Sequence, residues 1–215
     1  MGLLWPGQAR ALQSPARWRD AVATYVAPYV QMNDFSGTIL LFQPGKDSVV
    51  SGFGFADRAT RRPNAPDTRY AIGSLTKTFT AAAIALLRDR GQLSLADTLG
   101  KFIPGFPHGG EITLAQLLGH RAGIPDYHSL PDYTARRAHP VTLAEFAAWI
   151  ATKPLDFRPG EKDAYSSSGY ALLGDVIERV SGVTYSDFLR RNIFEPLGMT
   201  ETGDLTDPGA MQRVA

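Results

Sequence analysis

The spacing of apolar residues near the start of the chain changes from a helical period to two extended runs. Apolar side chains recur every three or four positions over residues 16–30, which predicts an amphipathic helix. Two apolar runs follow at residues 35–42 and 48–56, and the turn-forming residues 44–47 separate them, so we expect a β-hairpin. The polar segment 57–67, rich in Arg and Pro, predicts a loop.

From Ser74 onward the apolar period is 3.6 residues and predicts helices only. The first helix runs from Ser74 to about Arg90, and its predicted buried face is Phe79, Ala82, Ala83, Leu86 and Leu87. Further helices are expected at residues 113–119, from the capping-box pair Thr142 and Glu145 to about residue 151, at 169–180 and at 184–193.

This order of elements predicts an α+β fold in which the sheet is incomplete. An isolated hairpin is at best marginally stable in water, so the two predicted strands need further strands beside them. We expect those strands to lie beyond Ala215. Residues 1–215 would then form part of one domain, with a helical region at about 75–165 and the hairpin at 35–56.

Composition narrows the range of partners. The chain has 215 residues, a formal net charge of +1 and no run of like charge, which argues against nucleic acid or an anionic membrane as a partner. It has no cysteine, which excludes disulfides and thiolate chemistry. Residues 1–13 are too broken by Pro6 and Gly7 for a signal-peptide core or a transmembrane segment. A small-molecule or peptide substrate is the expected partner, and the oligomeric state stays open.

Ser74 and Lys77 form the first candidate for catalytic chemistry. Residues i and i+3 share one face of a helix, so the serine hydroxyl and the lysine amine can meet. Serine becomes a nucleophile when a neighbouring base takes its proton, and burial favours the neutral form of an amine. The alternative is structural, because Ser-x-x-Lys arises by chance and a serine at a helix start is commonly a cap.

Tyr165 and Ser167 form the second candidate, just before the helix predicted at 169–180. A phenol next to a lysine ammonium can transfer protons, and Ser167 can hydrogen-bond the lysine or a substrate amide. An interfacial tyrosine beside a serine cap is the structural alternative. Tyr127 and Ser129 repeat the Tyr-x-Ser form without a helix directly after them, so we treat them as a decoy.

Taken together, these residues resemble the serine beta-lactamase-like family of class C beta-lactamases, D-Ala-D-Ala carboxypeptidases and related esterases. That family has Ser-x-x-Lys and then Tyr-x-Asn roughly ninety residues later, and here Tyr165 lies 91 positions after Ser74. Similar segments extend over most of the chain, at residues 69–74, 91–97, 117–125 and 196–199.

The resemblance implies a beta-lactamase/transpeptidase-like fold, with an antiparallel sheet, packed helices and a helical subdomain. It also implies a serine hydrolase that forms an acyl-enzyme with an ester or amide, such as a beta-lactam, a D-alanyl peptide or a short-chain ester. Ser74, Lys77 and Tyr165 would be catalytic and Ser167 would bind substrate, with no cofactor and no metal. A periplasmic or extracellular location is implied, although no signal peptide is visible in residues 1–13.

Two departures from the family pattern bear on activity. Ser167 stands where the family most often has Asn, so an amide donor is lost. The family's third motif, a Lys-Thr-Gly or His-x-Gly strand that donates one oxyanion N–H group, does not occur after Met199. Loss of one such donor costs about 10²–10³-fold in rate. We therefore expect these 215 residues alone to be weakly active or inactive unless a second chain completes them.

The sequence also allows a second function and raises the question of its four histidines. The rival function is that of a catalytically impaired, truncated family member that binds peptidoglycan-like ligands or assembles with other subunits. The histidines at positions 108, 120, 128 and 139 lack metal-ligand spacing and are expected in loops or at the surface. His120 is set apart because it lies in the family-like segment 117–125. No Gly-x-Ser-x-Gly elbow is present, which argues against an α/β-hydrolase triad.

Overall fold

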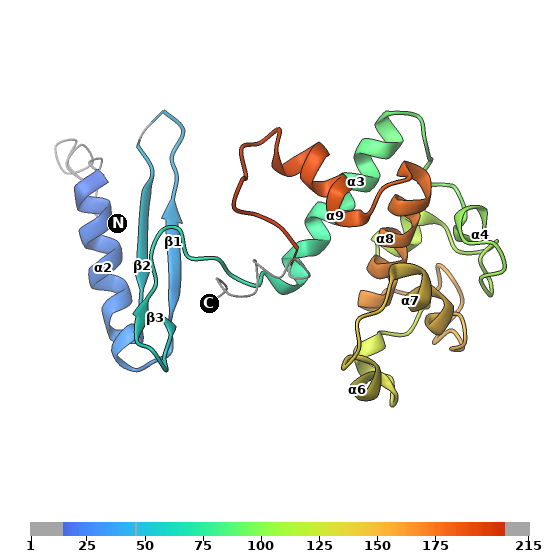
Figure 1. The fold of residues 1–215 in the computed structure, drawn as a ribbon, viewed down its shortest axis with the longest axis horizontal. Helices are drawn as coiled ribbons and strands as arrows, with labels where there is room; N and C mark the ends of the chain where they lie inside the picture. The colour runs from blue at the N-terminus through green and yellow to red at the C-terminus, as the bar shows by residue number, and fades with distance from the viewer. Residues whose placement is uncertain (1–14, 46, 205–215) are drawn as a thin grey trace, which may run out of the picture. The chain divides into compact units, whose positions relative to one another are not determined.

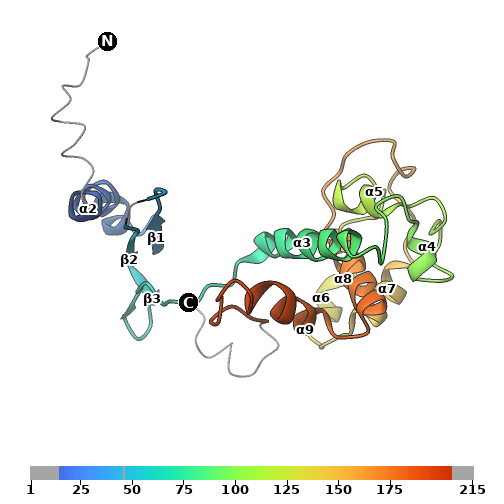
Figure 2. The ribbon, with the colours of Figure 1, turned by 90° about the horizontal axis from the view of Figure 1, so that it is seen from above.

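The structure is a computed structural model that describes residues 15–45 and 47–204, and these form two compact units. The first unit contains the described residues up to Ala71 together with Asp204, and the second runs from Ile72 to Gly203. Each unit is described on its own below (Figures 1 and 2). Among the described residues, no helix has both the length and the apolar character needed to cross a bilayer.

The first unit combines a helix with a hairpin, as the apolar pattern predicts. Helix α2 (Pro15–Gln31) lies beside an antiparallel hairpin of β1 (Gly37–Leu41) and β2 (Val49–Phe53) (Figure 1). The register pairs Gly37 with Phe53 and Leu41 with Val49. The predicted helix and hairpin are therefore confirmed, while Lys46 of the predicted turn lies outside the described residues.

The second predicted strand and the polar loop after it need a correction. The strand is broken at Gly54, whose φ of +64° is left-handed. Beyond it, β3 (Phe55–Asp57) pairs antiparallel with β4 (Arg62–Pro63), so part of the predicted loop is a small hairpin. The Asp57 carboxylate accepts the backbone N–H groups of Ala59 and Thr60 at 2.8 and 3.2 Å, which closes the turn between these strands.

The second unit is helical. Its elements in chain order are η1 (Gly73–Leu75), α3 (Thr76–Asp89), α4 (Leu99–Phe102), α5 (Leu114–Leu118), η2 (Tyr127–Ser129), α6 (Tyr133–Arg136), α7 (Leu143–Ile150), α8 (Ser167–Ser181), α9 (Tyr185–Leu189) and the π-helical η3 (Arg190–Phe194). Helix α8 contacts α3, α5, α7 and α9 (Figures 1 and 2). The predicted helices at α3, α5, α7 and α8 are confirmed. The last predicted helix, 184–193, is instead a short α-helix that continues as a π-helical turn.

The core of this unit lies on the apolar face of α8. Leu172, Leu173, Val176 and Ile177 are fully buried there, and each such side chain contributes about 1.5–3 kcal/mol on burial. The facing side of α3 buries Ala83, Ile84 and Leu87. The predicted face of α3 was therefore wrong at Ala82, which is exposed, because Ile84 takes the inward position.

Side-chain caps define the ends of the helices around the site. Thr142 and Glu145 form the predicted capping box at the start of α7. Thr113 and Gln116 form a second capping box at the start of α5. Gly182 ends α8 in a left-handed conformation with φ +73°. These caps satisfy backbone groups that a helix end would otherwise leave without partners.

Gly123, between α5 and η2, offers a test of the packing that holds this segment. Its φ is +74°, and an added Cβ would overlap the backbone carbonyl oxygen of Phe157. At Gly105 φ is +81° but an added Cβ meets nothing within 4 Å. We expect Gly105→Ala to lower the free energy of unfolding by about 1–2 kcal/mol, the cost of the left-handed backbone alone. Gly123→Ala should lower it further, as urea denaturation would measure. Equal losses would contradict this account.

Candidate active site

Ser74 lies in the single turn η1 directly before α3, and its side chain does not cap either helix. Its Oγ lies 2.6 Å from the Tyr165 hydroxyl and accepts a hydrogen bond from Lys77 Nζ at 3.2 Å. The structure therefore brings the three predicted groups together. It also argues against the capping alternative, because the serine hydroxyl is directed to a phenol and an amine.

Lys77 is held between hydroxyl groups and aromatic rings. Its Nζ also donates to Ser167 Oγ at 3.3 Å. It lies 4.9 Å from the ring centroid of Tyr165 and 5.6 Å from that of Tyr170. A cation at these distances is attracted to the faces of aromatic rings. The amine is thus fixed relative to both Ser74 and Tyr165.

Three consecutive serines at the start of α8 make different hydrogen bonds, although Ser166 and Ser168 both donate to the Pro125 carbonyl. Ser166 is the N-cap, and its Oγ accepts the backbone N–H of Gly169. Ser167 is directed to Lys77, as described above. Ser168 is fully buried, and its Oγ donates to the Pro125 carbonyl at 2.7 Å and accepts the Tyr127 N–H at 2.9 Å. Because Ser166 caps the helix, Ser167 remains available to the candidate site.

The phenol of Tyr165 is electrostatically suited to accept a proton. Contact with Lys77, followed by contact with Ser74, holds the pKa of Tyr165 below its usual range. The decoy Tyr127 behaves in the opposite way, since burial raises the pKa of its phenol. A lowered pKa increases the fraction of phenolate near neutral pH, which a general base requires.

A cavity of about 380 Å³ opens beside these groups. Ser74, Lys77 and Ser167 line one part of it, and Leu143, Gly174 and Tyr185 line another. Gly174 leaves room that a side chain would remove, because a Cβ there would come within 3.1 Å of Leu143 Cδ1. All of these residues belong to the second unit.

Comparison with known proteins identifies the family of the chain. A profile of the family described as Beta-lactamase matches residues 22–215. The chain belongs to the beta-lactamase family.

The chain is similar to known proteins both in sequence and in structure. Penicillin-binding protein 4* of Bacillus subtilis (strain 168) is 34% identical over 175 residues, which cover 80% of this chain and 38% of that protein. The crystal structure of a penicillin-binding protein from Bacillus halodurans is 33% identical with a TM-score of 0.72, covering 83% of this chain and 56% of the other.

A third similar structure is that of an amidase. The D-amino acid amidase from Ochrobactrum anthropi SV3, solved with L-phenylalanine amide, is 29% identical with a TM-score of 0.75, covering 86% of this chain and 52% of the other. The beta-lactamase/transpeptidase-like α+β fold expected from the sequence is thus confirmed. The chain spans less than half the length of these relatives in Bacillus subtilis (strain 168): 38% of Penicillin-binding protein 4* and 44% of the putative penicillin-binding protein PbpX.

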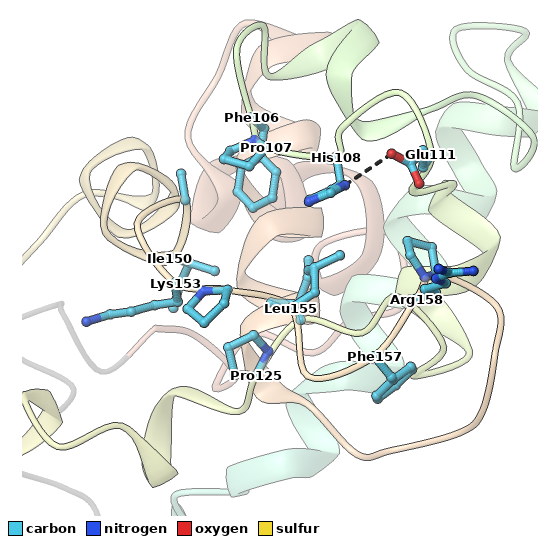
Figure 3. A pocket seen from close by; sticks show the side chains of 14 residues that line it. Phe106, Pro107, His108, Glu111, Pro125, Ile150, Lys153, Leu155, Phe157 and Arg158 are labelled. Carbon is cyan, nitrogen blue, oxygen red and sulfur yellow. Dashed lines mark hydrogen bonds and ion pairs between the residues drawn. The ribbon is translucent and has the colours of Figure 1, made fainter.

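A second and larger cavity in this beta-lactamase-family chain lies apart from Ser74. It has a volume of about 490 Å³, with Ile124, Ile150 and Phe157 among its buried lining residues. In Figure 3 the imidazole of His108 points to the carboxylate of Glu111, and the structure places His108 Nδ1 3.1 Å from Glu111 Oε1. No serine lines this cavity, so we assign the chemistry to the cavity at Ser74.

His120 lies close to the candidate site, whereas the sequence predicted for it only a position in a loop or at the surface. It is partly buried, and its ring centroid lies 4.6 Å from that of Tyr165. Burial and the neighbouring Lys77 hold the pKa of its imidazole below the usual value. Its place in the family-like segment 117–125 was the available signal. Among the described residues, no cluster of three His, Asp or Glu side chains could hold a metal ion.

The lowered pKa of Tyr165 predicts the effect of removing the Lys77 charge. In Lys77→Met the stabilising cation is gone, so the pKa of Tyr165 should rise and the phenolate fraction at neutral pH should fall. The measurement is the tyrosinate absorbance as a function of pH. Subtracting the titration of the same protein with Tyr165→Phe leaves the contribution of the Tyr165 phenol. Lys101→Met is the control, because Lys101 is exposed and paired with Asp97 at 2.8 Å. An unchanged titration of Tyr165 in Lys77→Met would refute the assignment of cause.

Proposed function

We propose that this chain carries the nucleophile and the proton-transfer groups of a serine hydrolase that cleaves an ester or amide through an acyl-enzyme. The observation that carries the proposal is the 2.6 Å contact between Ser74 Oγ and the Tyr165 hydroxyl, with Lys77 Nζ 3.2 Å from the same Oγ. Family membership supports a hydrolase of this general type.

In the proposed reaction, the Tyr165 phenolate accepts the proton of Ser74 as Oγ attacks the substrate carbonyl carbon. The Lys77 ammonium stabilises the phenolate before this transfer. The tetrahedral intermediate then expels the alkoxide or amine, which takes the proton from Tyr165, and Ser74 is left acylated. Water attacks the acyl carbon in the second half, gives its proton to the same phenolate and releases the acid with Ser74 restored.

Local electrostatics favour the first step. Ser74 lies at the N-terminal end of α3, a helix of 14 residues, whose positive end stabilises negative charge. Removing a preorganised donor from such a centre costs about 10²–10³-fold in rate. Neither Lys-Thr-Gly nor His-x-Gly, the family's motifs for a second donor, occurs between Met199 and Ala215.

The cavity, the relatives and Ser167 each bear on the proposed substrate class. The cavity at Ser74 combines hydroxyl groups with the apolar side of Leu143 and Gly174 and suits a small acyl group. Penicillin-binding proteins and a D-amino acid amidase among the relatives favour a beta-lactam, a D-alanyl peptide or another D-amino acid amide. Ser167 lacks the amide donor that Asn would supply, which weakens recognition of an amide and keeps a short-chain ester among the proposed substrates.

The second candidate is an impaired family member that binds peptidoglycan-like ligands or assembles with other subunits. Ser167, at the position where the family most often has Asn, favours it. The intact contact of Ser74 with Tyr165 and Lys77 opposes it. Covalent labelling distinguishes the two, because only the hydrolase forms an acyl-enzyme.

A fluorescent penicillin and a fluorophosphonate probe test the nucleophile. Both the 215-residue chain and any longer product of its gene are to be assayed. We expect the longer product to be labelled more strongly. Ser74→Ala should abolish labelling and Tyr165→Phe should slow it about 10²-fold or more, the contribution of a general base. Ser129→Ala, which removes an exposed hydroxyl that donates to the Asp126 carbonyl and does not line the Ser74 cavity, should label at the wild-type rate. Wild-type protein that takes up neither probe would favour the impaired family member.

Ser167 provides a test of substrate preference. Asn at this position adds an amide donor beside the cavity, and one added hydrogen bond of ~1.4 kcal/mol corresponds to about tenfold. We expect Ser167→Asn to raise the ratio of penicillin acylation to p-nitrophenyl ester turnover about tenfold. Ser129→Asn, at the exposed decoy position, should leave the ratio unchanged. A lower ratio in Ser167→Asn would show that the serine does not weaken amide recognition.

A further inference from the structure

His120 is attached to the segment that carries Tyr165 at three consecutive points. Its backbone carbonyl accepts the N–H of Ala164 at 2.9 Å. Its Nδ1 accepts the N–H of Ser166 at 3.2 Å. Its ring lies against Tyr165, with centroids 4.6 Å apart and planes tilted by 36°. The residues before and after Tyr165 are thus hydrogen-bonded to one histidine, and the phenol ring packs on it.

The backbone conformation of His120 makes these contacts possible. Its φ is +56°, in the left-handed region that few non-glycine residues adopt, and His and Asn are among those enriched there. The next residue extends the attachment, since Arg121 and Gly160 exchange backbone and side-chain hydrogen bonds at 2.7 Å. Tyr170 also lies beside His120, with the two ring centroids 5.2 Å apart.

We propose that the neutral imidazole of His120 is a positioning residue that fixes the Tyr165 phenol against Ser74 and Lys77, and that its protonation releases this phenol. The proposal deepens the proposed function and rests on it. A phenol held at 2.6 Å from Ser74 needs its ring and backbone fixed, because small displacements of a general base reduce the rate strongly. His120 itself has no role in the covalent steps.

The charge state of His120 follows from its surroundings. As an acceptor, Nδ1 carries no proton, so Nε2 holds it in the neutral ring. The titratable groups around the ring are Lys77 on α3, Tyr165 before α8, Tyr170 on α8 and Asp126 before η2. Burial and Lys77 disfavour the imidazolium more than Ser166 and Asp126 favour it, which lowers the pKa of His120.

The direction of the pH effect can be worked out from this shift. The ordinary pKa of histidine is about 6.5, and that of folded His120 lies lower. The Ser166 contact is therefore intact at neutral pH. It is lost as the pH falls through the lowered value, when a proton on Nδ1 would face the N–H of Ser166. The stability that this group contributes is lost over the same acidic range.

Two substitutions of His120 test its hydrogen-bond acceptor and its aromatic ring separately. His120→Asn tolerates the left-handed backbone, keeps an acceptor close to the position of Nδ1 and cannot be protonated in this range. His120→Phe keeps a ring and loses the acceptor. The tyrosinate absorbance titration, taken as the difference from Tyr165→Phe in each background, reports the phenol without any substrate. The acylation rate with the fluorophosphonate probe is measured from acidic to neutral pH in parallel.

For His120→Phe we expect the pKa of Tyr165 to rise and the acylation rate to fall about 10- to 100-fold, with probe affinity within about threefold of wild type. For His120→Asn we expect the low pKa and the neutral-pH rate to be restored to within about threefold, and the acid loss of rate to move to lower pH. Wild-type phenol titration and pH profile in both variants would overturn the proposal. So would equal losses in both variants that follow a fall in melting temperature.

These outcomes are distinct from failure of the proposed function. If wild-type protein takes up no probe, the hydrolase assignment fails, while the absorbance titration still shows whether His120 controls the Tyr165 phenol. If labelling depends on Ser74 but the phenol titrates identically in all His120 variants, the hydrolase stands and the positioning role is rejected.

Discussion

The contact between the apolar faces of α3 and α8 sets the geometry of the candidate site. Ile84 and Leu87 on α3 and Leu172 and Val176 on α8 are fully buried, so these helices cannot slide past each other without opening cavities in the core. The hydroxyl and amine come from the start of α3, and the phenol precedes the start of α8. Because both helix starts are fixed by the same core, groups 91 positions apart meet within 2.6 Å.

The loops around the two helix starts refine this coarse alignment. Ser168 is buried and holds the Pro125–Tyr127 segment through two hydrogen bonds. Arg121 forms an ion pair at 3.0 Å with Asp163, which lies two residues before Tyr165 in the chain. Ion pairs this exposed contribute little to stability, so the buried serine is the stronger restraint. The phenol is therefore positioned by its flanking segments as well as by its own contacts.

Much of this architecture could be predicted from the sequence where a pattern repeats over several turns. The 3.6-residue period identified α3 and α8, and a capping-box pair identified α7. The family-like spacing of Ser74, Lys77 and Tyr165 identified the groups that meet. The four-residue helices α4 and α6 are one turn long, which is too short for a period to appear. The break at Gly54 depends on a backbone angle that the apolar run does not encode.

The contacts of His120 show a different limit. Its hydrogen bond to Ser166 joins residues 46 positions apart, and no local pattern in residues 117–125 points to that partner. Only the resemblance of that segment to a known family marked it for attention.

The hydroxyl, the amine, the phenol and Ser167 all lie within the unit Ile72–Gly203, on fewer than half of its elements. This unit is one continuous segment of the chain, and it also contains the side chains that line the cavity beside Ser74. A rearrangement of the sequence outside the segment would therefore leave the four groups and their cavity together.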